Sequence, residues 1–535
     1  MARWVAGACA VVLVGTWAGL GWCLDSRQPH EGMGRKGQHP AVELARGVVF
    51  EDANGDGVRQ AGEAGLEGVA VSNGRDVVLT DAAGRYEVPA IEGKAIFVIK
   101  PAGYAVPTDE HNLPRFFFNH EPAGSPIGLR YAGLAPTGAL PESIDFALRP
   151  IDEPEAFGVL LLGDPQPRDQ AELGYFVHDV LDDVRNSELG RRARLAIALG
   201  DVMFDDLSLL QPYIEAMSVL GVPVHNVHGN HDMNFDVPDD RHADATWRRL
   251  FGPGTYAFTV GRAHFIVLDD VVYEGDKRYR GDLDDDQLAF VRNVLALVPR
   301  DDLIVLAMHI PLPSVQRRAE LLEILSPFEN TLSVAAHWHR QALFELGSED
   351  GWRGSRPHRH LVQATASGSW WAGVPDERGI PHATMSDGQP NGWSMLLIDG
   401  NRYAVRFKAA GRPEHEQMAI DLPAVVPAGE LAQAMLRVNA WASGPGSTVQ
   451  FRVDDGPWQP MAHAPQHDRA YLAMKAMEEQ FPGLPGRTLP DPSIAQTIWQ
   501  ASMPAELSPG VHDVQVRHID PYGQAWTARR TLWVR

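Results

Sequence analysis

Five short apolar runs, each followed directly by a polar cluster, organise the middle of the chain. The runs are residues 158–162, 194–199, 222–227, 303–308 and 332–336. Short apolar runs bounded by turn residues are typical of strands in a sheet that is covered on both faces. The clusters that follow them are Asp164-Pro165-Gln166, Gly200-Asp201, Gly229-Asn230-His231-Asp232, His309 and His337-Trp338-His339. Because α/β folds place their sites at one end of the sheet, we expect these clusters to converge there.

The donor atoms of these clusters indicate a metal site. Carboxylates, carboxamides and imidazoles without a thiolate suit Mn, Fe, Zn or Co, and they argue against a structural zinc or iron–sulfur site. There are more donors than one ion needs, so we expect two divalent ions that share a bridging carboxylate, for which Asp201 is the candidate. Taken alone, His309 is more typical of a buried core histidine than of a metal ligand. Asp164-Pro165-Gln166 taken alone is more typical of a turn. The order and strand context of all five clusters favour the metal site.

The ordered series Asp-x-(His or Gln), Gly-Asp, Gly-Asn-His-Asp, His and His-x-His resembles the calcineurin-like metallophosphoesterase superfamily. The resemblance implies a two-sheet αββα sandwich. It implies that one ion is held by Asp164, Gln166, Asp201 and His339, and the other by Asp201, Asn230, His309 and His337. His231 would be the proton donor, oriented by Asp232. The chain departs from the commonest pattern at Gln166, where His is usual, and at Ala336, where Gly is usual.

The activity implied by this resemblance is hydrolysis of phosphate mono- or diesters, with a metal-bridging hydroxide as nucleophile. The substrate would be a small-molecule or cell-envelope phosphate ester. Two alternatives stay open, namely a metal-dependent amide or ester hydrolase and a non-catalytic exported surface-binding protein with a vestigial metal centre. The presence of His231 and of a complete second ligand set favours an enzyme over the binding protein.

Length and charge limit the function classes. A chain of 535 residues is too long for one hydrophobic core, so several domains are expected. The net charge of −22 argues against a nucleic-acid surface and against a polybasic membrane anchor. The sequence does not predict an oligomeric state.

The first 44 residues are predicted to be a targeting segment followed by a linker. Arg3 and an apolar stretch from Trp4 to Leu20 resemble a secretory signal peptide over residues 1–21, which implies a periplasmic or extracellular protein. An uncleaved membrane anchor is the alternative. Residues 22–44 have the composition of a linker. The two cysteines, Cys9 and Cys23, leave no internal disulfide in a mature chain.

Two β-rich regions flank the predicted catalytic domain of residues 150–408. Residues 45–149 predict a small antiparallel β-sandwich, and residues 409–535 predict a second one with an irregular Pro- and Met-rich insertion at about 460–500. This order resembles exported bacterial calcineurin-like phosphoesterases with N- and C-terminal β domains.

A calcium loop is predicted within the first β-rich region. Oxygen donors at Asp52, Asn54, Asp56, the Val58 carbonyl and Glu63 match a twelve-residue calcium loop, with Gly57 at the sharp turn. Such an ion would be structural. A polar hairpin with Asn-Gly and Asp-Gly turns is the alternative.

A tryptophan pair follows the last metal motif. Trp370-Trp371 lies in a stretch rich in aromatic and turn residues without helical period, which predicts a loop over a cleft. This stretch could form a wall of the substrate site. Packing of the two tryptophans between domains is the alternative.

Overall fold

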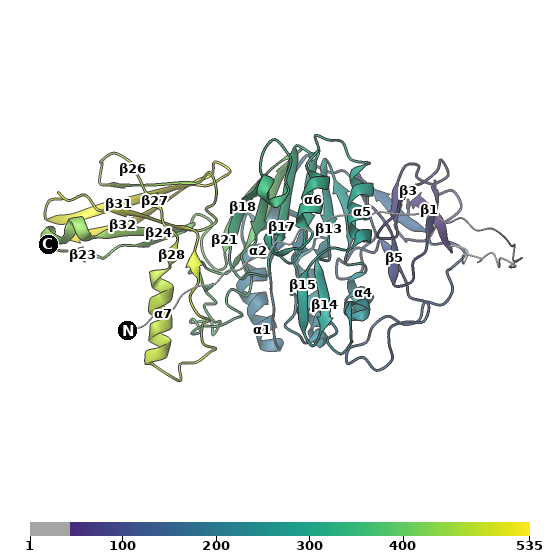
Figure 1. Ribbon diagram of the computed structural model, residues 1–535, viewed down its shortest axis with the longest axis horizontal. Coiled ribbons are helices and arrows are strands. Elements are labelled where there is room, and N and C mark those ends of the chain that lie inside the picture. The colour runs from purple at the N-terminus through teal and green to yellow at the C-terminus, as the bar shows by residue number, and fades with distance from the viewer. Residues whose placement is uncertain (1–42) are drawn as a thin grey trace, which may run out of the picture. The chain divides into compact units, whose positions relative to one another are not determined.

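The computed structural model describes residues 43–535 (Figure 1), and the predicted signal peptide lies outside these residues, as does nearly all of the predicted linker. Residues Glu43–Arg535 form one compact unit. It is a mixed α/β structure with several sheets. Within this part of the chain, no helix combines the length and apolar character that crossing a bilayer requires.

Two four-stranded sheets form the N-terminal region. Their orders are β4-β1-β8-β6 and β3-β2-β5-β7. The strands are β1 (Leu44–Glu51), β2 (Ala70–Ser72), β3 (Val77–Leu79), β4 (Arg85–Pro89), β5 (Lys94–Val98), β6 (Tyr104–Ala105), β7 (Phe117–His120) and β8 (Phe146–Pro150). The expectation of a wholly antiparallel region is wrong at one place, because β1 and β8 pair in parallel, with Val49 opposite Phe146. Parallel neighbours need a long crossover, and the whole region between β1 and β8 supplies it.

All five predicted strands form, but they belong to two sheets. The first sheet has the order β11-β10-β9-β20-β21 and the second the order β12-β13-β16-β17-β19-β18. The strands of the first are β9 (Ala156–Leu162), β10 (Ala193–Ala198), β11 (Val224–Asn226), β20 (Gly392–Asp399) and β21 (Arg402–Ala409). Those of the second are β12 (Tyr256–Val260), β13 (Ala263–Val267), β16 (Leu303–Ala307), β17 (Asn330–Ala335), β18 (Ala342–Leu346) and β19 (His358–Val362). A separate hairpin consists of β14 (Val271–Gly275) and β15 (Arg278–Gly281).

Alternate residues of β9 and β10 pack in opposite directions. Val159, Leu161 and Ile197 join the core that contains the second sheet, whereas Leu160 and Ala196 join a core with the helices between β9 and β11. This alternation is the period-two pattern of a strand buried on both faces. The helical elements of this second core include α1 (Gln170–Tyr175), the π-helical turn η1 (Phe176–Leu181), α2 (Asp182–Asn186) and α3 (Leu210–Met217).

Helices α5 (Asp285–Leu295) and α6 (Arg318–Leu325) share the core of the second sheet (Figure 1). The remaining helix of this region is α4 (Ala245–Phe251). Short 3₁₀ turns are η2 (Gly190–Arg192), η3 (Leu207–Leu209), η4 (Ser218–Leu220), η5 (Asp240–His242), η6 (Leu312–Ser314), η7 (Ser348–Asp350) and η8 (Ala428–Gln433). Each central sheet is therefore packed against helices of its own.

Two further sheets form the C-terminal region around one core. Their orders are β22-β24-β30-β27 and β23-β32-β31-β25-β26, and β28 pairs with β29. The strands are β22 (Met418–Asp421), β23 (Val425–Val426), β24 (Met435–Ala440), β25 (Thr448–Val453), β26 (Gln459–Pro460), β27 (Ala462–His463), β28 (Gln466–His467), β29 (Ile494–Ala495), β30 (Ile498–Ser502), β31 (Gly510–Ile519) and β32 (Ala525–Val534).

The insertion at 460–500 is more regular than predicted, because it contains helix α7 (Arg469–Gln480) (Figure 1). Asp468 caps this helix by accepting a hydrogen bond from the backbone N–H of Tyr471. The capping carboxylate and a run of good helix formers explain the helix. The sequence-based expectation of an irregular insertion missed the capping signal.

Candidate metal centre

The carboxyl ends of strands from both central sheets carry the predicted site residues. Asp164 follows β9, Asp201 follows β10 and Asn230 follows β11, all in the first sheet. His309 follows β16 and His337 follows β17, both in the second. The predicted convergence therefore joins residues of two sheets, whereas the strand pattern alone indicated a single sheet.

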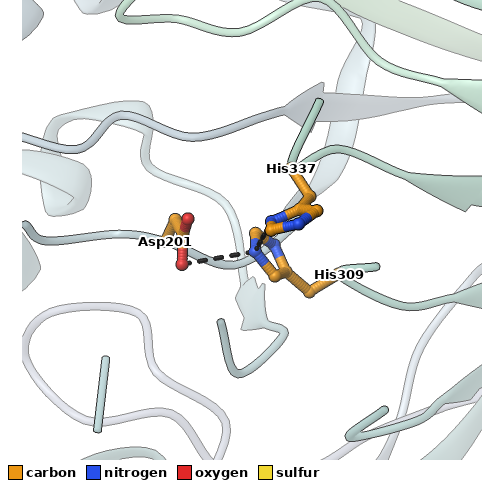
Figure 2. A group of neighbouring side chains, drawn as sticks. All are labelled: Asp201, His309 and His337. Atoms are coloured by element: carbon orange, nitrogen blue, oxygen red, sulfur yellow. Dashed lines mark hydrogen bonds and ion pairs between the residues drawn. The ribbon is translucent and has the colours of Figure 1, made fainter. Parts of the chain in front are cut away.

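Asp201, His309 and His337 form a close group, which Figure 2 shows. The Nε2 atom of His309 lies 3.3 Å from Oδ1 of Asp201 and 3.2 Å from Nδ1 of His337. Asn230 belongs to the same group, since its Oδ1 is 3.0 Å from the same Nε2. The four residues predicted for one ion thus lie together.

The hydrogen bonding of His309 favours a cation at this place. Its Nδ1 donates to the carbonyl of Leu199 at 2.8 Å, so Nε2 is left facing the oxygens of Asp201 and Asn230 and a nitrogen of His337. Such a convergence of electron pairs requires a proton or a metal ion between them. A buried carboxylate, a carboxamide oxygen and two imidazoles are a donor set that fits a divalent transition metal.

The remaining predicted ligands, Asp164, Gln166 and His339, lie around the group of Asp201, Asn230, His309 and His337. Asp164 is fully buried and accepts a hydrogen bond from the backbone N–H of His337 at 2.9 Å. His339 donates from Nδ1 to the carbonyl of Gly368 at 2.6 Å. That bond fixes the tautomer and leaves Nε2 of His339 as the free nitrogen.

Gln166 contacts the predicted bridging carboxylate. Its Nε2 donates to Oδ2 of Asp201 at 2.7 Å. Its Oε1 is buried and has no hydrogen-bond partner among residues 43–535. A buried carbonyl oxygen without a partner is unfavourable, and coordination of a cation would satisfy it.

The predicted role of Asp232 in orienting His231 is wrong. Asp232 is fully buried, and its carboxylate accepts backbone N–H groups of Val202, Met203 and Gly229. The ring of His231 instead donates from Nδ1 to Oδ1 of Asp205 at 2.6 Å. Asp232 follows His231 directly in the chain, but its side chain is occupied by the neighbouring loop.

Several site residues have strained backbones. The φ angles of Asp164, Gln166, Asp201, His337 and His339 lie between 38° and 64°. Non-glycine residues rarely adopt this left-handed region, and such strain concentrates at functional sites.

The two glycines of the motifs are required by close approach. A Cβ at Gly200 would lie 2.4 Å from Nδ1 of His309, and one at Gly229 would lie 2.1 Å from the backbone nitrogen of Asp201. A larger residue at either position would displace His309 or Asp201. The Gly-Asp and Gly-Asn pairs of the sequence therefore have a packing reason.

Burial and charge set the protonation states. Burial raises the pKa of Asp164 well above its usual value. Burial opposes ionisation of Asp201 as well, but the charges of His309 and His231 lower the pKa of that carboxyl. Burial lowers the pKa of His337 to about 3 and that of His339 to about 4, which favours the neutral, metal-binding form of both rings.

Aromatic residues that sequence reasoning did not assign pack against the site histidines. Phe204 stacks on His231 with ring centroids 4.4 Å apart, and Tyr279 from β15 lies 5.8 Å from His337. Neither residue belongs to a recognisable motif, so only the three-dimensional structure could find them.

The two tryptophans of the 368–373 stretch have different surroundings. Trp371 is 1% exposed and donates from Nε1 to the carbonyl of Pro165 at 2.9 Å. Trp370 stacks on His339 with centroids 4.1 Å apart. The pair therefore holds the metal motifs in place from one side.

The predicted calcium loop is ordered by its own carboxylates. Asp52, which is buried, accepts backbone N–H groups of Gly55 and Gly57 at 2.7 and 3.0 Å. Glu63 accepts those of Ala53 and Gln60 at 3.2 and 2.9 Å. These bonds equally suit a polar hairpin, and calcium binding stays a prediction.

Two family profiles match the chain. The N-terminal region of calcineurin-like phosphoesterases matches residues 53–131, and their C-terminal region matches residues 360–526. The metal motifs lie between the two matches. No match was found among curated proteins.

Solved structures give weaker likenesses. A purple acid phosphatase from seeds of yellow lupin (Lupinus luteus) aligns at 11% identity and a TM-score of 0.34, over 64% of this chain and 66% of its own. The structure of PhoD aligns at 12% identity and a TM-score of 0.34, over 69% of this chain and 89% of its own. At these scores the alignments do not establish a common fold.

Proposed function

Because the chain belongs to the calcineurin-like phosphoesterases that carry N- and C-terminal domains, we propose that it is a metal-dependent hydrolase of phosphate mono- or diesters. The observation that carries the proposal is the convergence of Asp201, Asn230 and His337 on Nε2 of His309. The proposal includes an αββα arrangement for the two central sheets, within residues 150–408. Export is proposed from the sequence alone, since the predicted leader lies outside the described residues.

The proposed cofactors are two divalent ions, drawn from Mn, Fe, Zn or Co. One would be held by Asp164, Gln166, Asp201 and His339, and the other by Asp201, Asn230, His309 and His337. When bound, such ions supply positive charge for the phosphoryl oxygens and lower the pKa of water, so that hydroxide is available near neutral pH.

His231 is the proposed proton donor. Its backbone N–H donates to Oδ1 of Asp201, the proposed bridging carboxylate, at 2.8 Å, and this contact supports the assignment. Its Nδ1 is bonded to Asp205, so Nε2 is the nitrogen available to a leaving group. Burial lowers the pKa of His231, but the carboxylates of Asp201 and Asp205 outweigh burial and raise it. These carboxylates therefore favour the protonated ring, which is the form that can donate a proton to a departing alkoxide.

We expect Gln166→His to tighten the ion that Asp164 and His339 hold, because imidazole is a stronger donor than a carboxamide oxygen. Calorimetric titration of metal-free protein with Mn should give two unequal binding steps in the wild type and more similar steps in the variant. Identical isotherms would show that Gln166 only supports the turn after Pro165.

A substrate panel tests the proposed reaction class. Metal-reconstituted protein should release p-nitrophenol from p-nitrophenyl phosphate or bis(p-nitrophenyl) phosphate and should leave p-nitrophenyl acetate largely intact. The ratio of the first two rates measures the preference for mono- or diesters. Turnover of the acetate alone would replace the proposal with an ester hydrolase, and no turnover of any of them would favour a binding protein.

A further inference from the structure

We propose that a cavity between the N-terminal sheets and the two central sheets binds a small amphipathic anion, with an apolar body and a single anionic head. The cavity measures about 270 Å³, close to the lower end of the range for small-molecule sites, roughly 300 Å³. Its walls come from β6, the end of β8, the starts of β10 and β11, and β12. This site is separate from the metal centre.

The inner wall of the cavity is mostly aliphatic. Its apolar lining includes Ala105, Ile151, Leu195, Val222, Phe258 and Val260. A wall of this kind favours an apolar ligand body, since burying it removes apolar surface from water.

One polar side chain lies within this apolar wall without a partner. His225 is 7% exposed and stacks on Phe258 with ring centroids 3.8 Å apart. Its Nδ1 is buried and has no hydrogen-bond partner in the described part of the chain. Buried polar atoms are rarely left unpaired, so this imidazole is a candidate for contact with a bound molecule.

The charges at the cavity favour an anion. Lys100 is neutralised by Glu153, whose carboxylate lies 2.7 Å from its Nζ. Arg149 and Arg194 also line the cavity and are exposed, and neither forms an ion pair within residues 43–535. Arg194 donates a hydrogen bond to the backbone carbonyl of Asp152 at 3.3 Å, so both guanidinium groups keep their charge uncompensated by a carboxylate. Guanidinium groups bind carboxylate and phosphate oxygens in a forked geometry, so the head of the ligand would lie between them.

The cavity and the metal centre lie at opposite ends of the same strands. Leu195 is near the start of β10, whereas Asp201 follows its end. On β11, His225 lies within the strand, whereas Asn230 follows its end. Five or six residues separate the paired positions, which corresponds to roughly 17–20 Å at about 3.3 Å of rise per residue of extended chain. The proposed ligand is therefore not the substrate of the metal centre.

Calorimetric titration of the full chain with octanoate tests the proposal. We expect saturable binding with one site per chain, and binding of octan-1-ol or octylamine at least about tenfold weaker, because only octanoate supplies the anionic head. The double variant Arg149→Gln/Arg194→Gln should weaken the binding of octanoate by at least about tenfold and leave the binding of octan-1-ol unchanged. Arg530→Gln removes an exposed arginine without an ion pair on β32 and serves as the matched control.

A second variant tests the apolar wall. Ala105→Phe places a ring into the cavity and should abolish binding of octanoate, with the folded state checked by thermal melting. Absence of saturable binding to the wild type would overturn the proposal. Undiminished binding to the double arginine variant, whose substitutions are exposed and leave the core untouched, would overturn it as well.

Discussion

Removal of divalent ions by a chelator is expected to abolish hydrolysis of phosphate esters, and addition of Mn, Co, Zn or Fe to restore it. The reason is the donor set around Nε2 of His309, in which a carboxylate, a carboxamide oxygen and two imidazoles converge in the way that suits a divalent cation. Without ions, the buried carboxylate of Asp201, whose pKa is lowered, would repel an anionic substrate.

The measurement is the initial rate with p-nitrophenyl phosphate, together with metal content by elemental analysis. Dialysis against buffer without chelator is the control. Full turnover by a sample shown to be metal-free would contradict the dinuclear proposal.

Two substitutions are expected to separate metal binding from proton donation. Asp201→Asn removes the charge of the proposed bridge and should weaken both ions together. His231→Ala should leave metal content nearly intact and slow turnover by roughly 10²–10⁴-fold, the usual contribution of a positioned general acid. Metal content and the rate at saturating metal, measured for each variant, distinguish the two effects.

Two controls vary the leaving group of the substrate and the hydrogen-bond partner of His231, Asp205. A substrate with a low-pKa leaving group needs less protonation, so it should lose less rate in His231→Ala than an alkyl ester. Asp205→Asn should show the same dependence with a smaller loss, because it disturbs the ring without removing it. Lys277→Met is the matched control, since Lys277 contacts the other oxygen of Asp205 at 2.6 Å. Loss of metal in His231→Ala would show that the proton-donor assignment is wrong.

The strands and the site motifs could be predicted from the sequence because each is local. An apolar run such as residues 158–162 has one structural interpretation when turn residues bound it, and β9 covers it. The division of the strands between two sheets was not predictable in this way. β9 pairs with β20, so that Leu161 lies opposite Ser394, and no local pattern indicates a pairing over such a separation.

The partner of His231 shows the same limit within the site. Asp232 is its chain neighbour, and the resemblance to the superfamily implied the orienting role for it. Asp205 reaches the ring only because the loop after β10 turns back, with a left-handed backbone at Asp205 itself. Three-dimensional contacts of this kind depend on the packing of loops, which the motif alone does not specify.

The division of the ligands between two sheets links metal affinity to folding. Asp201 and Asn230 follow strands of the first sheet, and His309 and His337 follow strands of the second. An ion bound to all four would join the two sheets at the carboxyl ends of these strands, and its binding free energy would add to the free energy of their docking. The same residues that would perform chemistry would then also act as a cross-link between the two halves of the hydrophobic core.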